Sequence, residues 1–403
     1  MKSLLVPIGF VLAFFIACEG LIPGVPSENS LLDGPQEGLS EEEMGQFLAG
    51  DIAFADVFST QTGLGPFFVA TSCASCHIGD GKGHPFTTLT RFGQNSPGVN
   101  TFVGNGGPQL QNRAIPGHLP EAIPVGASFS NFTPPAVTGL GFLAALNDTQ
   151  ILANADPNDL NMDGISGVPN YLDAPDYFIE KTIHQINNGQ YIGRFGKKAA
   201  AITLQIQTVN AYNQDMGITS DFERSEPSIY DRGFTGADNV LDPEVPTSTI
   251  ANVVFYLRTL KAPLRRNENN RQVQSGDALF SSIGCGNCHI QEWTTPETDI
   301  DALSQKTFSP YTDLLLHDMG SGLDDGYTEG IAQTSEWKTP ALWGLGLSKD
   351  AQGGQYFLMH DGRARSIEEA ILMHGGEAQN SRDQFASLSS SEKTDLIKFL
   401  ESL

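Results

Sequence analysis

The sequence has 403 residues, of which 39% are hydrophobic and 17% are charged. This composition excludes an intrinsically disordered chain and provides enough apolar residues for a sizeable core in more than one domain. The formal net charge of −24 argues against nucleic acid as a partner, because nucleic acid requires clustered Lys and Arg, and it favours basic soluble partners.

The first residues predict a signal peptide. One positive charge, Lys2, precedes an apolar run that ends at Ala17. The run is too short to span a bilayer as a mature helix, but it is typical of the apolar region of a signal peptide. Residues 1–17 are therefore expected to be removed on export to the periplasm.

Cys18 follows the sequence Phe15-Ile16-Ala17, which resembles a bacterial lipoprotein cleavage site. We expect Cys18 to carry a lipid, which would be the protein's contact with a membrane; the alternative is an ordinary signal peptide cut nearby. Residues 18–39 are rich in Gly, Pro, Ser and Glu, with little apolar periodicity, and are predicted to be a flexible tether.

Four of the five cysteines fall in two copies of the pattern Cys-x-x-Cys-His. The copies are Cys73-Ala74-Ser75-Cys76-His77 and Cys285-Gly286-Asn287-Cys288-His289. This is the attachment signature of c-type haem, in which the thiols bind the vinyl groups of the porphyrin and the histidine is the proximal iron ligand. A redox disulfide or half of a zinc site also uses Cys-x-x-Cys, but neither requires the histidine. We therefore predict two covalently bound haems, and no cysteine pair remains for a disulfide.

The two signatures lie within two copies of one order of elements. A helical segment with aromatic residues precedes each signature, and a helix with apolar residues at helical spacing closes each module. The predicted segments are residues 50–58 and 249–257 in the first module, and residues 275–283 and 395–400 in the second. Ser389 and Glu392 form a capping box before the last helix. This is the order of elements in a class I cytochrome c domain.

We therefore predict a mainly α fold of two class I cytochrome c-like domains, residues 40–265 and residues 266–403, with a polar linker at residues 261–274. The first domain is too long for a minimal cytochrome. Its excess lies between Gly79 and Gln190, where Gly, Pro and Asn predict long loops over the haem edge and a short hairpin.

Within this insertion, Asp159, Asn161 and Asp163 alternate oxygen ligands before Gly164, as in the first half of a calcium-binding loop. The glutamate that ends such a loop is absent. Because Asn and Asp also fill ordinary turns, the segment is either a calcium site or a polar turn.

Several segments, including the first signature, carry a family resemblance. They are TSCASCHIGDG at 71–81, GRFG at 193–196, DMGIT at 215–219, LHDMG at 316–320, HDGR at 360–363 and HGGEA at 374–378. They are similar to those of the bacterial di-haem oxidoreductase family, which is related to the di-haem cytochrome c peroxidases. The resemblance covers nearly the whole mature chain and implies an enzyme that passes electrons between two haems.

The resemblance also implies a sixth ligand for the second haem. In the peroxidases this ligand comes fourteen residues after the histidine of a His-Asp-Gly or His-Ser-Gly turn, and counting from His360 that position is His374. The second haem would then be held by His289 and His374, which gives a lower potential than a His/Met pair. Met373 is the rival ligand, and the alternative role for His374 is to cap a helix end.

The residues around His374 favour a helix that presents it. Ser366 and Glu369 are expected to form a capping box, and Gly375-Gly376 is expected to end the helix just after His374. His317 and His360 are expected to be structural and to hold turns by hydrogen bonds.

The same comparison addresses the first haem. Where the peroxidases carry an interhaem Trp, a Leu, a distal Gln and a catalytic Glu, this chain has Lys197, Leu204, Gln207 and Asp215. Asp215 comes earlier along the chain than the glutamate and is one methylene shorter. The resemblance implies that Gln207 orients a peroxide and that Asp215 is the acid/base residue.

Lys197 is the larger departure from the family, because an ammonium group cannot carry an electron hole between haems as Trp can. Phe195 is a poor substitute for that Trp. Either the haems approach closely without a relay, or Lys197 is a distal ligand or a cation that positions peroxide; it is otherwise a solvated lysine.

These observations predict a di-haem oxidoreductase of the peroxidase type, in which peroxide binds opposite His77 and an electron-donor protein or small reductant supplies the electrons. The alternative from another class is an electron-transfer cytochrome, in which Met216, Met319, His84 or Lys197 is the sixth ligand of the first haem iron. A third alternative is an oxidase that acts on a protein side chain or a sulfur compound.

Overall fold

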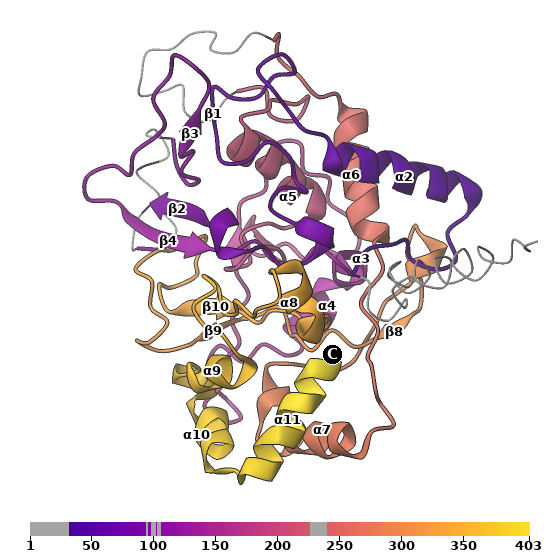
Figure 1. The fold of residues 1–403 in the computed structure, drawn as a ribbon, viewed down its shortest axis with the longest axis vertical. Helices are drawn as coiled ribbons and strands as arrows, with labels where there is room; N and C mark the ends of the chain where they lie inside the picture. The colour runs from indigo at the N-terminus through magenta and orange to yellow at the C-terminus, as the bar shows by residue number, and fades with distance from the viewer. Residues whose placement is uncertain (1–31, 94–95, 98–101, 103–105, 226–239) are drawn as a thin grey trace, which may run out of the picture. The chain divides into compact units, whose positions relative to one another are not determined.

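The computed structural model describes residues 32–93, 96–97, 102, 106–225 and 240–403. The predicted signal peptide, Cys18 and the first part of the predicted tether lie outside the described residues. Residues 32–403 belong to one compact unit. The fold is dominated by helices, with small two-stranded sheets (Figure 1). In the part of the chain that the structure describes, no helix is both long and apolar enough to cross a membrane.

Short elements joined by long loops make up the chain. The helices are α2 (Glu41–Ala55), α3 (Leu140–Ala145), α4 (Asp148–Leu152), α5 (Leu204–Asn210), α6 (Thr247–Thr259), α7 (Arg271–Ser282), α8 (Ser348–Ala351), α9 (Ile367–Leu372), α10 (Gln379–Ser387) and α11 (Ser390–Ser402). The antiparallel strand pairs are β1 (Phe67–Phe68) with β3 (Arg113–Ala114), β2 (Leu89–Gly93) with β4 (Ser128–Phe132), β5 (Tyr171–Leu172) with β6 (Tyr191–Ile192), β7 (Trp293–Thr294) with β8 (Thr307–Phe308), and β9 (Leu316–Asp318) with β10 (Glu336–Lys338). Each of these strands has one partner, so the sheets fasten loops together and do not form a layer.

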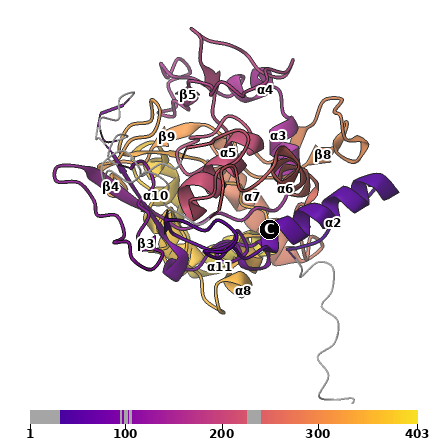
Figure 2. The ribbon, with the colours of Figure 1, turned by 90° about the horizontal axis from the view of Figure 1, so that it is seen from above.

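Two crossed helix pairs repeat one close contact. α2 packs against α6, and α7 packs against α11 (Figures 1 and 2). A Cβ atom on Gly50 of α2 would lie 2.2 Å from the carbonyl oxygen of Asn252, and one on Gly276 of α7 would lie 2.1 Å from that of Asp395. Glycine is therefore required at both crossings, because only a residue without a side chain lets the backbones approach this closely.

The aromatic residues at the crossings repeat as well. Phe54 and Phe280 follow the two glycines at the same spacing, and their rings lie 5.3 Å from Tyr256 and 5.3 Å from Phe399, respectively. The same two rings lie 6.1 Å and 6.3 Å from the histidine rings of the first and second Cys-x-x-Cys-His segments. The internal repeat expected from the sequence is thus present at the level of single residues.

Capping boxes start two of the four crossing helices. Ser40 and Glu43 form one at the start of α2, and Ser389 and Glu392 form one at the start of α11. The second was predicted from the sequence. The first was missed, and for this reason α2 begins and ends earlier than the predicted segment at residues 50–58.

Two predicted boundaries need correction. α7 begins at Arg271, so the end of the predicted linker at residues 261–274 is helical. The predicted tether at residues 18–39 is not free along its whole length, because the N–H of Gln36 donates to the carbonyl of Thr259 at 2.7 Å. The last part of this segment is therefore fastened to the end of α6.

The insertion between Gly79 and Gln190 contains more regular structure than the loops and short hairpin that its composition predicts. β2 and β4 pair over five positions, with Leu89 opposite Phe132. α3 and α4 are helices that the composition did not indicate. The ring of Phe142 in α3 stacks on Phe308 of the second module, with centroids 4.9 Å apart. The insertion therefore joins the two modules through a shared core cluster.

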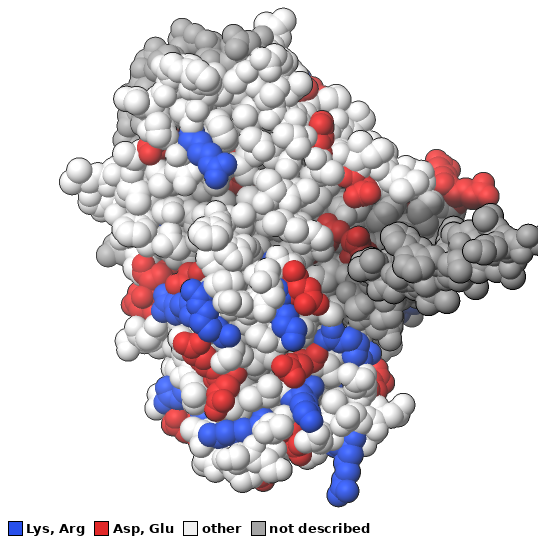
Figure 3. Space-filling model, viewed as in Figure 1, with Lys and Arg blue, Asp and Glu red and all other residues white. Residues whose placement is uncertain are grey.

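Charged side chains of both signs are interspersed on the face seen in Figure 3. They gather over the lower half of this view, where α10 and α11 lie, and are sparser over the upper half. One surface ion pair of α10, Arg382 with Asp383 at 2.8 Å, is typical of this arrangement. Neither sign forms a continuous patch on this face.

Candidate di-haem site

The two Cys-x-x-Cys-His segments fold as the same tight turn. In the first, the N–H groups of Cys76 and His77 donate to the carbonyl of Cys73 at 3.1 and 3.0 Å. In the second, the N–H of His289 donates to the carbonyl of Cys285, also at 3.0 Å. All the cysteines and histidines of both segments line one internal cavity.

Three histidines that line this cavity share one hydrogen-bond arrangement. Nδ1 of each ring lies 2.8 Å from a backbone carbonyl oxygen, and the pairs are His77 with Pro135, His289 with Tyr311, and His374 with Ala370. Because a carbonyl oxygen only accepts, Nδ1 carries the proton and Nε2 keeps a lone pair. In the described part of the chain, no protein group bonds to these Nε2 atoms.

Burial fixes the charge of these rings. It lowers the pKa of His77 and of His289 to about 4, and it lowers the pKa of His374 below its usual value. All three rings are therefore neutral at physiological pH. A neutral imidazole with its second nitrogen held by a backbone carbonyl is the form in which histidine ligates a metal.

The four thiols are also uncharged. Burial, followed by the nearby carboxylate of Asp215, raises the pKa of Cys73 to about 12 and that of Cys76 to about 11. Burial likewise raises the pKa of Cys285 to about 12. Redox and zinc-binding cysteines require accessible thiolates, so these surroundings favour haem attachment over both alternatives.

The cavity has a volume of about 540 Å³, and its walls come from both modules. Its apolar lining includes Phe54 and Leu204 from the first module, and Phe280 and Leu358 from the second. An apolar space bordered by uncharged thiols and by unpartnered Nε2 atoms fits a haem group at each signature. The structure therefore brings together every haem-binding residue predicted from the sequence.

α9 positions His374 at the cavity. Its N-cap, Ser366, accepts a hydrogen bond from the N–H of Glu369 at 3.0 Å. The Glu369 carboxylate bonds to the N–H of Arg365 at 2.6 Å and not to that of Ser366, so only half of the predicted capping box is formed. The helix ends at Leu372, before the predicted stop at Gly375-Gly376.

The structure separates the two rival ligands of the second haem. His374 lines the cavity, whereas Met373 does not and packs in the core cluster around α11. Nδ1 of His374 caps the carbonyl of Ala370 while Nε2 stays available. The capping and ligating roles of His374 are therefore compatible.

Leu204, Gln207 and Asp215 line the same cavity beside the first signature. Leu204 and Gln207 lie on α5, and Asp215 ends a π-helical turn, Ala211–Asp215, that continues from it. Such turns are rare and often occur at functional sites. Asp215 therefore reaches the cavity from the last position of this turn.

The carboxyl of Asp215 lies in a buried electrostatic environment. Burial raises its pKa to about 7, and the positive charge of Arg91 opposes this shift. A carboxyl with this pKa can both accept and donate a proton near neutral pH. Carboxyls with such a shifted pKa are common at functional sites, so Asp215 is the candidate acid/base residue of this cavity.

Arg91 and Glu329 belong to this site but were not predicted. Arg91, on β2, forms an ion pair with Glu329, and its Nη1 lies 3.4 Å from Oε1 of Gln214. Tyr327 donates from its hydroxyl to Glu329 at 3.2 Å. Both members of the pair line the cavity. They are 238 residues apart in the sequence, so no local pattern connects them.

The structure also separates the alternative sixth ligands of the first haem. Met216, Met319 and Lys197 line the cavity. His84 does not: it stacks on Phe86 with centroids 4.6 Å apart, and its Nδ1 accepts the N–H of Phe86. Lys197 faces the cavity, which argues against the solvated alternative for this residue.

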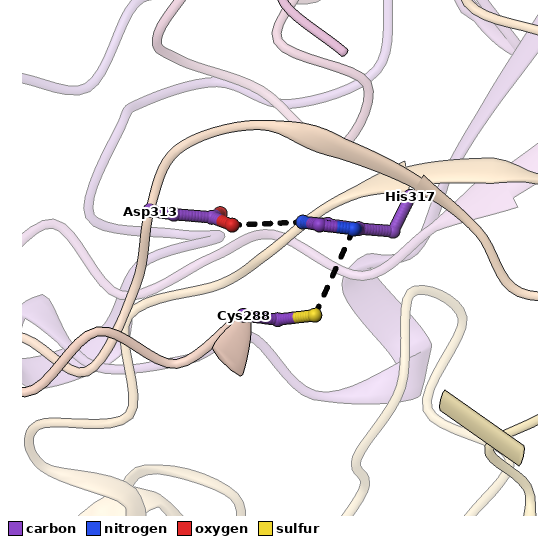
Figure 4. Close-up of side chains that lie close together, drawn as sticks. All are labelled: Cys288, Asp313 and His317. Atoms are coloured by element: carbon purple, nitrogen blue, oxygen red, sulfur yellow. Dashed lines mark hydrogen bonds and ion pairs between the residues drawn. The ribbon is translucent and has the colours of Figure 1, made fainter. Parts of the chain in front are cut away.

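His317 lies beside the second signature, with both ring nitrogens occupied (Figure 4). Nε2 lies 2.8 Å from Asp313, and Nδ1 lies 3.7 Å from Sγ of Cys288. Nδ1 also lies 2.7 Å from Glu377, which the figure does not draw. Burial alone would lower the pKa of His317, but these hydrogen bonds raise it to about 12. Among the described residues, Cys288, Asp313 and His317 are the one group close enough to hold a metal ion. An imidazolium cannot ligate a metal, so His317 holds the segment in place, as expected.

His360 also has the structural surroundings expected for it. Its ring stacks on Trp337, with centroids 3.8 Å apart and planes 10° from parallel. Its carbonyl accepts the N–H of Thr133 at 2.7 Å. This contact fastens the His-Asp-Gly turn to the insertion of the first module.

The predicted calcium loop closes on itself. Asn161 accepts the N–H of Asp163 at 2.9 Å, Asp159 accepts that of Gly164 at 3.2 Å, and Asp163 accepts that of Ile165 at 2.9 Å. These are side-chain turns of the kind that Asn and Asp make without a metal. They favour the polar-turn alternative, and no observation supports calcium.

These features define a class of protein: a redox protein in which two Cys-x-x-Cys-His turns and three neutral histidines surround one cavity. Residues 125–403 match the family described as "Di-haem oxidoreductase, putative peroxidase", and the chain belongs to this family. The family implies two haems, consistent with the two cysteine pairs. The resemblance inferred from the sequence is thereby confirmed, and the protein is an oxidoreductase.

No curated protein matches the chain. Among solved structures, one similar chain belongs to hydrazine synthase of Kuenenia stuttgartiensis pressurized with xenon; the two are 14% identical over 100% of both chains, with a TM-score of 0.38. A likeness of this size does not define a shared fold.

Proposed function

We propose that the protein is a di-haem peroxidase built from two class I cytochrome c-like domains. The repeated helix crossings and the repeated signature turns support the two-domain architecture. The observation that carries the function is Asp215, a carboxyl with a pKa of about 7 beside the first signature, in a cavity that the second signature also reaches.

Two sets of residues would hold the haems. Cys73 and Cys76 would form the thioether bonds of the first haem, with His77 as its ligand. The set for the second haem is Cys285, Cys288, His289 and His374. When bound, the haems supply an iron that accepts peroxide and the electrons that reduce it.

Asp215 would move the proton that the reaction requires. Its carboxylate accepts a proton from one peroxide oxygen and returns it to the other, so that the O–O bond breaks with water as the leaving group. Gln207 donates from its amide and orients the peroxide. Overall, peroxide, two electrons and two protons give two molecules of water. A pKa near 7 suits both directions of this transfer.

The second haem would act in electron transfer. His289 and His374 both keep Nε2 available, so both could ligate the iron of the second haem, which would then serve electron transfer. The first haem, held by His77 with Asp215 and Gln207 in the same cavity, would accept the oxidant. This asymmetry assigns different tasks to two haems bound by the same signature.

The test compares Asp215→Asn with Asp301→Asn, an exposed carboxylate outside the cavity. Because the base form of Asp215 is required, kcat/KM of the wild type for hydrogen peroxide should rise with pH through about 7. In Asp215→Asn, kcat/KM for hydrogen peroxide should fall about 100-fold or more and should no longer depend on pH in this range. Wild-type kinetics in Asp215→Asn would show that another residue moves the proton.

Met216 and Met319 favour a second candidate, because both residues line the cavity. If one of them ligates the first iron, the protein is an electron-transfer cytochrome. Electron paramagnetic resonance separates the two functions. A high-spin ferric signal that changes on addition of hydrogen peroxide supports the peroxidase, and two low-spin signals that do not respond support the cytochrome.

We also propose that the protein works in the periplasm as a lipoprotein. The apolar run at residues 1–17 and the cysteine at position 18 support this location. The net charge of −24 favours a basic electron-donor protein, or a small reductant, as its partner.

A further inference from the structure

Three lysines line the cavity, and none of them forms an ion pair with a described residue. Lys82 follows the first signature, Lys197 lies in the turn before α5, and Lys338 ends β10. Nζ of Lys82 donates to the carbonyl of Met359 at 3.1 Å, and Nζ of Lys338 donates to that of Thr339 at 3.4 Å. In the part of the chain that the structure describes, Nζ of Lys197 has no hydrogen-bond partner, and none of the three lysines forms an ion pair.

Lys198, the next residue after Lys197, shows how this fold satisfies a buried lysine. Its Nζ lies 3.6 Å from the carboxylate of Asp325 and 2.9 to 3.1 Å from three backbone carbonyl oxygens. It also lies 3.9 Å from the ring centroid of Trp337. The fold thus supplies a counter-charge to one of two adjacent lysines and not to the one that faces the cavity.

Lys197 lies near both of the other lysines: its backbone carbonyl accepts the N–H of Lys338 at 3.0 Å, and its charge acts on Lys82. Burial, followed by the charge of Lys338, lowers the pKa of Lys197 to about 7, and burial followed by the charge of Lys197 lowers the pKa of Lys82. Burial lowers the pKa of Lys338 to about 8. The carboxylate of Asp361 opposes the shifts of Lys82 and Lys197, and that of Asp313 opposes the shift of Lys338, but burial prevails in all three. Gathering like charges in a space of low dielectric is costly unless an anion joins them.

We propose that Lys82, Lys197 and Lys338 form a carboxylate-binding cluster inside the cavity. The inference rests on the proposed function, because the haems that would occupy this cavity carry propionate carboxylates. Ammonium–carboxylate hydrogen bonds are charge-assisted and roughly twice as strong as neutral ones. The haem propionates are one source of such groups, and a free carboxylate is the other.

This cluster gives Lys197 a role that differs from those expected at its position. Its ammonium holds a carboxylate, and it neither binds iron nor carries an electron between haems. A positive charge beside a haem favours the reduced state, because the added electron is attracted to it. The cluster therefore raises the midpoint potential of the haem that it contacts.

The test uses the full-length, haem-loaded protein with carbon-13 in the propionate carboxyl groups. The variants are Lys197→Met and Lys338→Met, and the matched control is Lys306→Met, which alters an exposed lysine of the second module. Redox difference infrared spectra report the labelled carboxylates, and redox titration gives the midpoint potentials. In the cluster variants we expect the labelled bands to shift and a midpoint potential to fall. The control should match the wild type in both.

A second arm distinguishes the two sources of carboxylate. Sodium acetate is added to wild type and Lys197→Met, and their haem absorbance is compared. A response in the wild type alone, with unmoved labelled bands, identifies a free carboxylate as the ligand of the cluster. The proposal is overturned if neither the labelled bands nor the acetate response distinguishes the cluster variants from Lys306→Met.

Two further measurements separate a failure of the lysine cluster from loss of haem and from failure of the peroxidase function. Lys197→Arg and Lys338→Arg preserve the charge and should preserve the positions of the labelled bands, and they replace the Met variants if those lose haem. Turnover of hydrogen peroxide is measured independently. A wild type without turnover would refute the peroxidase function and leave the infrared result to decide the cluster.

Discussion

Removing the carboxylate of Asp148 is expected to destabilise the protein strongly. Asp148 forms an ion pair with Arg194 of the GRFG motif, and both side chains are 1% exposed. Nη1 of Arg194 also donates to three backbone carbonyls at and just after the end of α3, at 2.6 to 3.3 Å. Asp148 accepts a further hydrogen bond from the N–H of Gln185 at 2.7 Å. The pair thus holds the insertion to the segment that precedes α5.

The magnitude follows from this burial. Removing one partner of a buried ion pair costs about 3 to 5 kcal/mol, because the other charge is left without compensation. In Asp148→Ala the guanidinium keeps its carbonyl acceptors, so we expect the lower end, about 3 kcal/mol. The matched control is Asp299→Ala. Asp299 pairs with Arg258 while 57% exposed, and its loss should cost less than about 1 kcal/mol.

The assay is unfolding of the haem-loaded protein in guanidinium chloride, followed by far-ultraviolet circular dichroism, which gives the free energy of unfolding. The double variant Arg194→Met/Asp148→Ala removes both charges and should cost less than the sum of the two single variants. If Asp148→Ala costs no more than Asp299→Ala, the buried pair does not stabilise the fold and the reasoning is wrong.

Three further variants test other features of the structure. Gly276→Ala should lower the free energy of unfolding by about 1 to 3 kcal/mol, because its Cβ would lie 2.1 Å from the carbonyl oxygen of Asp395. Gly45→Ala, with nothing within 4 Å of the added Cβ, should be neutral or stabilising in the same guanidinium chloride titration, and equal costs would contradict the close helix crossing. His374→Ala should convert one low-spin haem to a high-spin haem in the electron paramagnetic resonance spectrum of the oxidised protein, whereas Met373→Ala should not. An unchanged spectrum of His374→Ala would exclude His374 as the ligand. His317 has a folded-state pKa raised from 6.5 to about 12, so its contribution to stability is full below pH 6.5 and declines as pH rises toward 12. His317→Gln should flatten the fall of the urea midpoint over that range, and an equal fall in both proteins would count against the imidazolium.

Features that depend on near neighbours in the chain could be predicted from the sequence. The signature turns need residues at most four positions apart, and the capping box at Ser389 needs Glu392 alone. The closing helices follow from apolar spacing over a few turns. The capping box of Ser40 and Glu43 carries the same signal. It was missed because the predicted helix was placed on the aromatic residues that follow Gly50.

Features that depend on distant contacts had no local signal. Arg91 and Glu329 meet across 238 residues, and the sequence around neither of them indicates a buried cation or anion. The π-helical turn after α5 has no composition of its own, so the sequence did not indicate it. The prediction of a free tether was wrong at Gln36 for a related reason, since a polar composition does not exclude a backbone hydrogen bond to a distant helix.

The insertion of the first module helps to assemble one cavity from two repeated modules. Its Pro135 supplies the carbonyl that fixes the tautomer of His77. Its Ser166 donates to Glu377, which holds His317 beside the second signature. A minimal repeat of helix, signature and closing helix has neither contact and would leave each haem site on its own. The residues in excess of a minimal cytochrome therefore fasten the surroundings of both signatures to one cavity, as the proposed reaction between two haems would require.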